Sequence, residues 1–179
     1  MANRNAVARI EKITRESFVN YLRRHGYTAE PMSEDLSSVY DKLPMPKRAT
    51  GGSAGYDFYT PVEIILKPGE EVVIPTFMKA KIFEDWCLIM LPKSGLGFKY
   101  HMVLANTIGL IDSDYYYSET DDDSNEGHLM IKLVNEGNKD LEIPQYSKFC
   151  QGVFLPYGVV ENEDEDFEKR NGGIGSTGE

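Results

Sequence analysis

Two aspartates separated by a single residue, Asp112 and Asp114, follow the apolar run at residues 109–111 and precede Tyr115. In an extended segment, side chains two positions apart lie on the same side of the chain. One of these carboxylates could therefore act as a general base, or both could attract a divalent cation. A polar hairpin tip is the alternative, and the residues alone leave both interpretations open.

Residues 92–97 form a second candidate site, in which Lys93 and Ser94 stand beside Gly95 and Gly97. Glycines let backbone N–H groups approach a ligand closely, and the lysine adds positive charge, so the composition is typical of a phosphate-binding loop. An ordinary turn with an incidental lysine is the alternative.

The end of the chain, residues 172–178, is rich in glycine and carries two hydroxyls, Ser176 and Thr177. Such a segment cannot hold itself in one conformation. It indicates either an unstructured terminus or an arm that becomes ordered around a bound anion.

Charge and hydropathy restrict the partners. The 179-residue chain has 19 Lys and Arg against 29 Asp and Glu, a net charge of -10. Because an acidic surface repels phosphate backbones, we expect no nucleic-acid polymer, whereas a small anion can still bind at a local cluster of positive groups. No apolar run approaches the ~20 residues that span a bilayer, and no signal peptide opens the chain, which favours a cytoplasmic protein without membrane contact.

The elements that must position these segments are short β-type runs separated by turn residues. We expect strands at residues 55–59, 62–66, 71–75, 78–83, 86–91, 102–106, 128–134, 141–143 and 150–157. Many short strands without long helices between them predict an all-β sandwich or barrel. The cysteines, Cys87 and Cys150, lie in apolar runs and are expected to be buried thiols.

Residues 1–43 differ in character from the rest. Apolar Phe18, Val19 and Leu22 predict a helix over residues 16–25, and a second short helix is expected over residues 33–41. We therefore divide the chain into three parts. These are a partly helical N-terminal extension (1–43), a β domain (44–160), and an acidic linker with a glycine-rich C-terminal arm (161–179).

Five segments, taken in order, resemble the five motifs of the trimeric dUTP diphosphatases. They are Ala-Gly-Tyr-Asp at 54–57, Pro-Lys-Ser-Gly-Leu at 92–96, Gly-Leu-Ile-Asp-Ser-Asp-Tyr at 109–115, Cys-Gln-Gly-Val-Phe at 150–154 and Gly-Gly-Ile-Gly-Ser-Thr-Gly at 172–178. The resemblance covers residues 44–178 and is to the bacterial and phage branch of the family. It implies a jelly-roll-like β-barrel or sandwich and a homotrimer with shared active sites. The C-terminal arm would close over a neighbouring subunit.

The same resemblance implies hydrolysis of dUTP to dUMP and pyrophosphate with Mg²⁺, which keeps uracil out of DNA and supplies dUMP for dTMP synthesis. The implied catalytic residues are Asp112, which activates the attacking water, Ser94, which stabilises charge on the leaving group, and Gln151, which faces the α-phosphate. Asp57 would reach the Mg²⁺ through a coordinated water. The implied substrate-binding residues are Lys93, Gly95, Asn106, Gly109, Ile111, Tyr115, Arg170, Gly173, Ile174, Gly175, Ser176 and Thr177.

Several positions depart from the family pattern. Lys93 replaces the usual arginine, which keeps the charge but removes the two-pronged geometry. Ile174 stands where a phenylalanine normally stacks on the uracil, so we expect weaker closure of the arm. Either Lys169 or Arg170 would reach the γ-phosphate. Residues 116–126 lengthen a hairpin that is normally tight, and we interpret them as surface decoration.

Two alternatives to a diphosphatase stay open. A dCTP deaminase, or a bifunctional deaminase-diphosphatase of the same fold, would need a glutamate beside the pyrimidine, and residues 106–115 contain none. A catalytically weak regulatory protein that responds to nucleotides is favoured by Lys93 and Ile174. The complete set of Ser94, Asp112, Tyr115 and Gln151 argues against this second alternative.

Overall fold

The computed structural model describes residues 6–25, 36–117 and 126–162. Its largest sheet has the strand order β2-β3-β12-β7-β9, with every neighbouring pair antiparallel. The bounds of these strands are β2 Lys47–Arg48, β3 Tyr56–Tyr59, β12 Lys148–Pro156, β7 Trp86–Pro92 and β9 Gly109–Ile111. The long strand β12 lies at the centre and connects the edge formed by β2 and β3 to the edge formed by β7 and β9.

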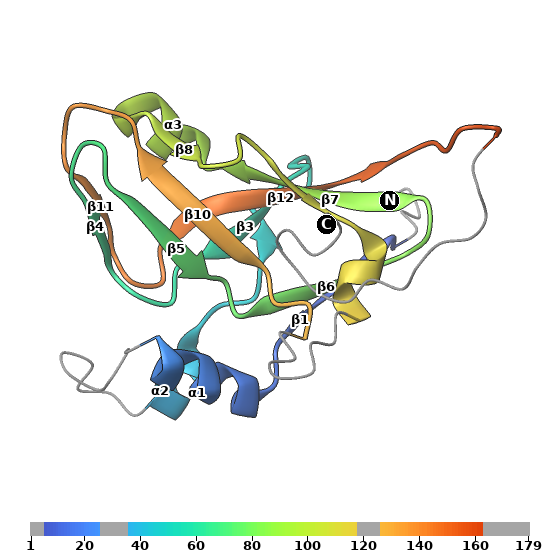
Figure 1. Cartoon of the computed structure of the whole chain (residues 1–179), viewed down its shortest axis with the longest axis horizontal. Helices are drawn as coiled ribbons and strands as arrows, with labels where there is room; N and C mark the ends of the chain where they lie inside the picture. Colours follow the sequence, from blue (N-terminus) through green and yellow to red (C-terminus); the bar gives the residue numbers. More distant parts are fainter. Residues whose placement is uncertain (1–5, 26–35, 118–125, 163–179) are drawn as a thin grey trace.

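Three smaller antiparallel sheets complete the described β structure, with the orders β5-β10-β8, β11-β4 and β1-β6. Their strands are β5 Glu71–Pro75, β10 Met130–Asn135, β8 Met102–Leu104, β11 Leu141–Ile143, β4 Ile64–Leu66, β1 Ala8–Lys12 and β6 Met78–Ile82. Figure 1 shows how these strands are arranged. The sheets enclose one apolar core, in which Phe58, Leu88 and Phe149 are completely buried. The expected all-β fold is confirmed.

Strand β6 shows how the sequence pattern orients side chains. Met78, Ala80 and Ile82 are buried, whereas Lys79 and Lys81 alternate with them and are only partly buried. Successive side chains of a strand point to opposite faces. The two lysines therefore lie on the outer face of the strand that pairs with β1.

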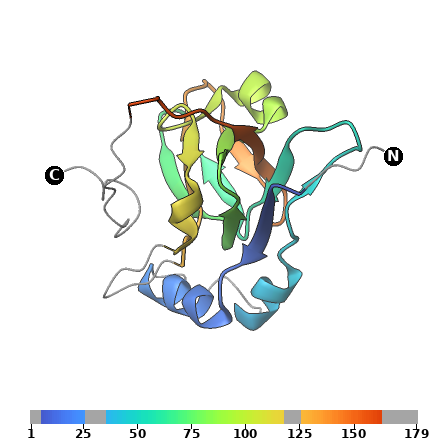
Figure 2. The same ribbon diagram turned by 90° about the vertical axis from the view of Figure 1, so that its right-hand side faces the viewer.

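The N-terminal residues pack directly on the β structure. Helix α1 (Arg15–Arg24) begins after Thr14, whose hydroxyl accepts a hydrogen bond from Ser17 N at 3.2 Å, the arrangement of an N-cap. Its buried Phe18 contacts Phe77 with ring centroids 4.4 Å apart. Helix α2 (Leu36–Lys42) lies beside α1, and Figures 1 and 2 both show the two helices together at one side of the β structure.

Five elements were not expected from the sequence. The short strands β1, β2 and β9 were missed, residues 94–100 form helix α3 (Ser94–Tyr100) instead of a glycine-rich loop, and the 3-10 helix η1 (Ser113–Tyr117) follows β9. Strand β8 also ends at Leu104, two residues before the expected end. Among the described helices, none is sufficiently long and apolar to cross a membrane.

Candidate active site

Strand β12 brings three of the sequence motifs together. It lies between β3 and β7, and Gln151 is paired with Asp57 on one side and with Leu91 on the other. Lys93 follows β7 directly, and its backbone N–H donates to Phe149 O at 3.1 Å. The end of this sheet therefore collects Asp57, Lys93 and Gln151 from three separate segments.

Asp57 is the centre of a group of charges that we call the lysine–aspartate cluster, consisting of Asp57, Lys93 and Lys148. The Asp57 side chain is 2% exposed, with Lys93 Nζ 2.5 Å from Oδ1 and Lys148 Nζ 2.8 Å from Oδ2. Burial alone would raise the pKa of Asp57, but the hydrogen bonds and charges of Lys148 and Lys93 outweigh it and lower this pKa. The carboxylate in turn raises the pKa of Lys148.

The cluster carries two positive charges against one negative charge. Both lysines remain partly exposed, at 28% for Lys93 and 39% for Lys148, so their ammonium groups can also contact a ligand. An excess positive charge held in place by a buried carboxylate suits a phosphate group. Ser94 and Gly95 open α3 and follow Lys93 directly in the chain.

Gln151 is positioned by close packing as well as by strand pairing. Its Nε2 lies 3.5 Å from Pro92 O, and a Cβ atom at Gly55 would stand only 2.8 Å from its Oε1. Glycine at position 55 therefore leaves the space that the amide occupies. This explains the glycine of the first motif by a contact with the fourth.

The donors of the cluster do not fit a metal ion that Asp57 would ligate directly, because both carboxylate oxygens face lysines. In the described ranges, no group of three or more His, Cys, Asp or Glu side chains could hold a metal ion. The arrangement fits a Mg²⁺ ion carried by the phosphates of a ligand, since Mg²⁺ commonly keeps several waters and binds through phosphate oxygens. Asp57 would then meet such an ion only through water.

The second group of candidate residues lies on what we call the Asp112 loop, residues 109–117. Gly109 and Ile111 of β9 are paired with Met90 and Leu88 of β7. Asp112 follows, and Asp114 belongs to η1, so the extended conformation that would place both aspartates on one side is absent here. Only one of the two carboxylates is therefore expected to serve as a base.

Tyr115 is buried beneath this loop, with 9% of its surface exposed. Its hydroxyl donates to His128 O at 2.9 Å, and its backbone N–H donates to Asp112 O at 3.3 Å. Tyr115 is thus fixed at its hydroxyl and at its backbone, so that its ring is held rigidly beside Asp112.

The two groups occupy opposite ends of β7. Asp112 follows Ile111, which pairs with Leu88 near the start of the strand, whereas Lys93 comes after its last residue. Five to six residues of a strand correspond to about 17–20 Å. Figure 1 accordingly shows α3 and the yellow η1 well apart along the molecule. One chain by itself does not bring Asp112 to Ser94 and Gln151.

The remaining expected residues are placed as follows. Asn106 lies in the turn between β8 and β9, where Thr107 has a φ of 66°. The expected arm residues lie outside the described residues: Lys169, Arg170, Gly173, Ile174, Gly175, Ser176 and Thr177.

Lys148 was missed from the sequence. A register shift between Lys148 and Cys150 interrupts the pairing of β12 with β3. A bulge of this kind breaks the alternation from which a side chain's direction is inferred. The only available signal was a lysine at the start of an otherwise apolar strand.

Comparison with known proteins gives consistent matches. The sequence profile of the dUTPase family matches residues 41–178. The deoxyuridine 5'-triphosphate nucleotidohydrolase of Lactococcus lactis subsp. lactis (strain IL1403) is 38% identical over 135 residues, which cover 75% of this chain and 87% of that protein. The crystal structure of a dUTPase from Streptococcus mutans matches with a TM-score of 0.61 and 26% identity over 86% of this chain and 98% of that one. The dUTPase of Staphylococcus aureus phage phi11 shares the fold, with a TM-score of 0.60 and 19% identity, covering 91% and 99%.

Proposed function

This chain belongs to the dUTPase family, and from that premise we propose that it hydrolyses dUTP to dUMP and pyrophosphate. The structural observation that supports this most directly is the lysine–aspartate cluster beside Ser94 and Gln151. Together with Gln151, the cluster joins residues of three sequence motifs into a positively charged site of the kind that a triphosphate requires. Such an activity keeps uracil out of DNA and supplies dUMP for dTMP synthesis.

Asp112 is the general base in this proposal. Its carboxylate takes a proton from a water molecule, and the oxygen of that water attacks the α-phosphorus. The bond between the α-phosphorus and the bridging oxygen of the β-phosphate then breaks, and pyrophosphate leaves with the bonding electrons. Lys93, Ser94 and the backbone of Gly95 stabilise the negative charge on the phosphates, and Gln151 faces the α-phosphate. When bound to these phosphates, Mg²⁺ neutralises part of their charge.

Recognition of the nucleoside is assigned to the segment from Asn106 to Tyr115. Backbone groups of this segment, which includes Gly109 and Ile111, read the uracil, and the ring of Tyr115 packs against the deoxyribose. Tyr115 is buried and held by two hydrogen bonds, which supports this role. A ring that cannot move leaves no room for a 2′-hydroxyl on the sugar that packs against it. The residues Arg170 or Lys169, Gly173, Ile174, Gly175, Ser176 and Thr177 are assigned to phosphate and base contacts of the C-terminal arm.

The separation along β7 supports a shared active site. Because Asp112 and the lysine–aspartate cluster lie at opposite ends of this strand, the two groups meet only if they come from different copies of the chain. We assign this assembly to a homotrimer, in which the Asp112 loop of one subunit faces the cluster of a neighbour and the arm of a subunit closes the site.

Pyrophosphate release tests the function. The purified chain, supplied with Mg²⁺, is compared on dUTP, dCTP, dTTP and UTP, with Asp112→Asn as the control. We expect release from dUTP alone and a loss of about 10²- to 10⁴-fold in kcat for the variant, which should still bind a non-hydrolysable dUTP analogue. Release of ammonia from dCTP would assign the chain to the deaminases. Tight binding of dUTP without turnover would identify a regulatory protein.

A further inference from the structure

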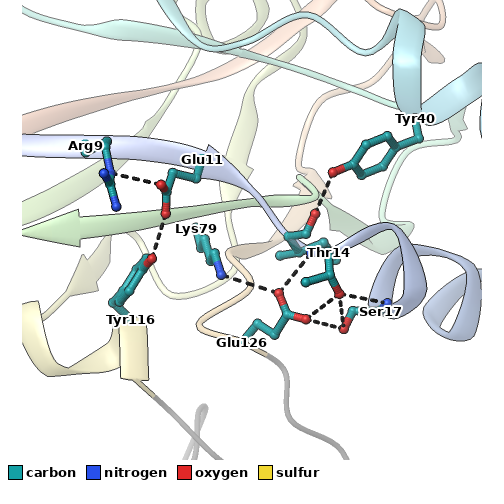
Figure 3. Close-up of polar contacts among 9 residues, drawn as sticks. Arg9, Glu11, Thr14, Ser17, Tyr40, Lys79, Tyr116 and Glu126 are labelled. Carbon is teal, nitrogen blue, oxygen red and sulfur yellow. Dashed lines mark hydrogen bonds and ion pairs between the residues drawn. The ribbon is translucent and has the colours of Figure 1, made fainter.

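The N-terminal segment contacts both ends of the hairpin extension at residues 116–126, although these parts are far apart in the sequence. At one end, Glu126 accepts hydrogen bonds from Thr14 N at 2.9 Å, from Thr14 Oγ1 at 2.5 Å and from Ser17 Oγ at 2.6 Å. Figure 3 shows the Glu126 carboxylate directed at the start of α1, with Lys79 of β6 on its other side. The carboxylate is thus surrounded by donors from two elements.

Electrostatics favour this contact. Burial would raise the pKa of Glu126, but the hydrogen bonds from Ser17 and Thr14 and the charge of Lys79 lower it to about 2. A negative charge is also favourable at the N-terminus of a helix. Glu126 therefore stays ionised at neutral pH and holds the first turn of α1.

The other end of the extension is fixed by Tyr116. Its hydroxyl donates to Glu11 Oε2 of β1 at 2.6 Å, and Glu11 Oε1 is paired with Arg9 Nε at 2.9 Å (Figure 3). Lys79 and Lys81 of β6 lie 5.1 and 5.9 Å from the centre of the Tyr116 ring. Tyr116 is thus held by the same β1-β6 ribbon that leads into α1.

These contacts connect to Asp112 through few steps. Gly127 packs so closely on the end of η1 that a Cβ atom there would lie 2.7 Å from Tyr115 O and 2.8 Å from Tyr116 Cα. The hydroxyl of Tyr115 bonds to His128 O, and its N–H bonds to Asp112 O. Movement of Glu126 or Tyr116 would therefore displace the backbone that carries Asp112.

We propose that Glu11, Thr14 and Ser17 are positioning residues for the Asp112 loop: by holding Tyr116 and Glu126, they fix the place of the Asp112 carboxylate. The proposal rests on the proposed function, since it takes Asp112 as the base. It revises our interpretation of residues 116–126 as decoration, because the two ends of the extension transmit order from the N-terminal segment to the catalytic loop.

The test compares variants that remove polar contacts of these residues with little change of side-chain shape. Tyr116→Phe loses only the hydroxyl, Glu126→Gln loses the charge and one of the two acceptor oxygens, and Thr14→Val loses the hydroxyl, and with it the cap of α1, but keeps the backbone N–H. Because a misplacement of about 1 Å can cost 10²-fold in rate, we expect kcat for dUTP to fall about tenfold in the double variant Tyr116→Phe, Glu126→Gln. The number of sites that bind a non-hydrolysable dUTP analogue should stay unchanged, so that the loss is one of rate per site. Thr14→Val should also lower kcat. Thr14→Ser, which keeps the hydroxyl, should have the wild-type kcat.

A matched control is Glu71→Gln, which removes a charge from the surface pair with Lys132 at 2.5 Å and should leave kcat unchanged. Hydrogen exchange of the amides at residues 109–117 gives a second measurement that does not need turnover. It should accelerate in the double variant and not in the control.

Two results overturn the proposal: a double variant with the wild-type kcat per binding site, or unchanged hydrogen exchange of the loop amides. If the wild-type chain itself fails to hydrolyse dUTP, the proposed function is wrong, and the exchange measurement still decides whether the N-terminal segment orders the loop.

Discussion

Lys148 Nζ lies 2.8 Å from Asp57 Oδ2, so a cation at the start of β12 neutralises a carboxylate that is buried in β3. Lys93 Nζ contacts Oδ1, the other oxygen of the same carboxylate. Asp57 thereby holds two lysines at fixed places beside Ser94 and Gln151. We therefore expect both the stability of the fold and the affinity for phosphate to depend on this carboxylate.

Replacement of Asp57 by asparagine should therefore weaken both. The variant leaves two ammonium groups facing each other without a counter-charge, and loss of one partner of a buried pair costs about 3–5 kcal/mol. Because the lysines are partly exposed and screened by water, we expect the free energy of unfolding, measured with urea, to fall by about 2 kcal/mol. KM for dUTP should rise as the lysines lose their orientation. The surface variant Glu71→Gln should change the free energy of unfolding by no more than about 0.5 kcal/mol. Equal stability of Asp57→Asn and wild type would contradict this account.

Gly55→Ala tests the position of Gln151. The added methyl group would stand 2.8 Å from Gln151 Oε1 and must displace the amide, whose side chain is flexible. We expect a clear loss of kcat with little change in the unfolding temperature. Gly51→Ala is a suitable control, because a Cβ atom there would meet no atom within 4 Å. An unchanged kcat in Gly55→Ala would show that Gln151 has no part in the reaction.

Mixing of subunits tests whether sites are shared. Chains carrying Asp112→Asn and chains carrying Gln151→Ala should each be nearly inactive. If one subunit supplies Asp112 and a neighbour supplies Gln151, random assembly at equal amounts restores about a quarter of the sites. Steady-state activity of co-refolded, differently tagged chains measures this fraction. No recovery would place the whole site within one chain, and light scattering at the mass of a monomer would exclude the trimer.

His128 should make the fold sensitive to acid. It is buried, its Nε2 accepts a hydrogen bond from Phe77 N at 3.0 Å, and burial lowers its pKa from 6.5 to about 3. Between these two values the unfolded chain binds a proton that the folded chain does not, so stability falls as the pH falls from 6.5 towards 3. The slope is about 1 kcal/mol per pH unit.

Urea unfolding at a series of pH values measures this slope. His128→Gln, which keeps an acceptor, should flatten it, whereas His101→Asn at an exposed position should not. Glu126 adds a second contribution at lower pH. Its pKa is depressed from 4.5 to about 2, so the stability that it supplies is present above 4.5 and is lost as the pH falls from 4.5 to 2. A stability profile that is flat from pH 6.5 to 4 would disprove the role of His128.

The sequence by itself determined most of the strands and the residues that make up the motifs. Alternation such as Met78, Ala80 and Ile82 against Lys79 and Lys81 follows from the two-residue period of a strand, which is a local property. The helix predicted over residues 16–25 is confirmed as α1, because its apolar spacing and its Thr14 cap are also local. The family of the chain was likewise visible in short, ordered motifs.

Tertiary structure decided everything that depends on pairs of residues far apart in the sequence. A bulge hid the contact of Lys148 with Asp57, and the pairing of β9 with β7 placed Asp112 away from the lysine–aspartate cluster. The hydrogen bonds from Thr14 and Ser17 to Glu126 join segments more than a hundred residues apart in the sequence. Such contacts form only when the complete core brings the segments together. They cannot be predicted from a local pattern, because that pattern does not indicate which distant residue will pair with a buried charge.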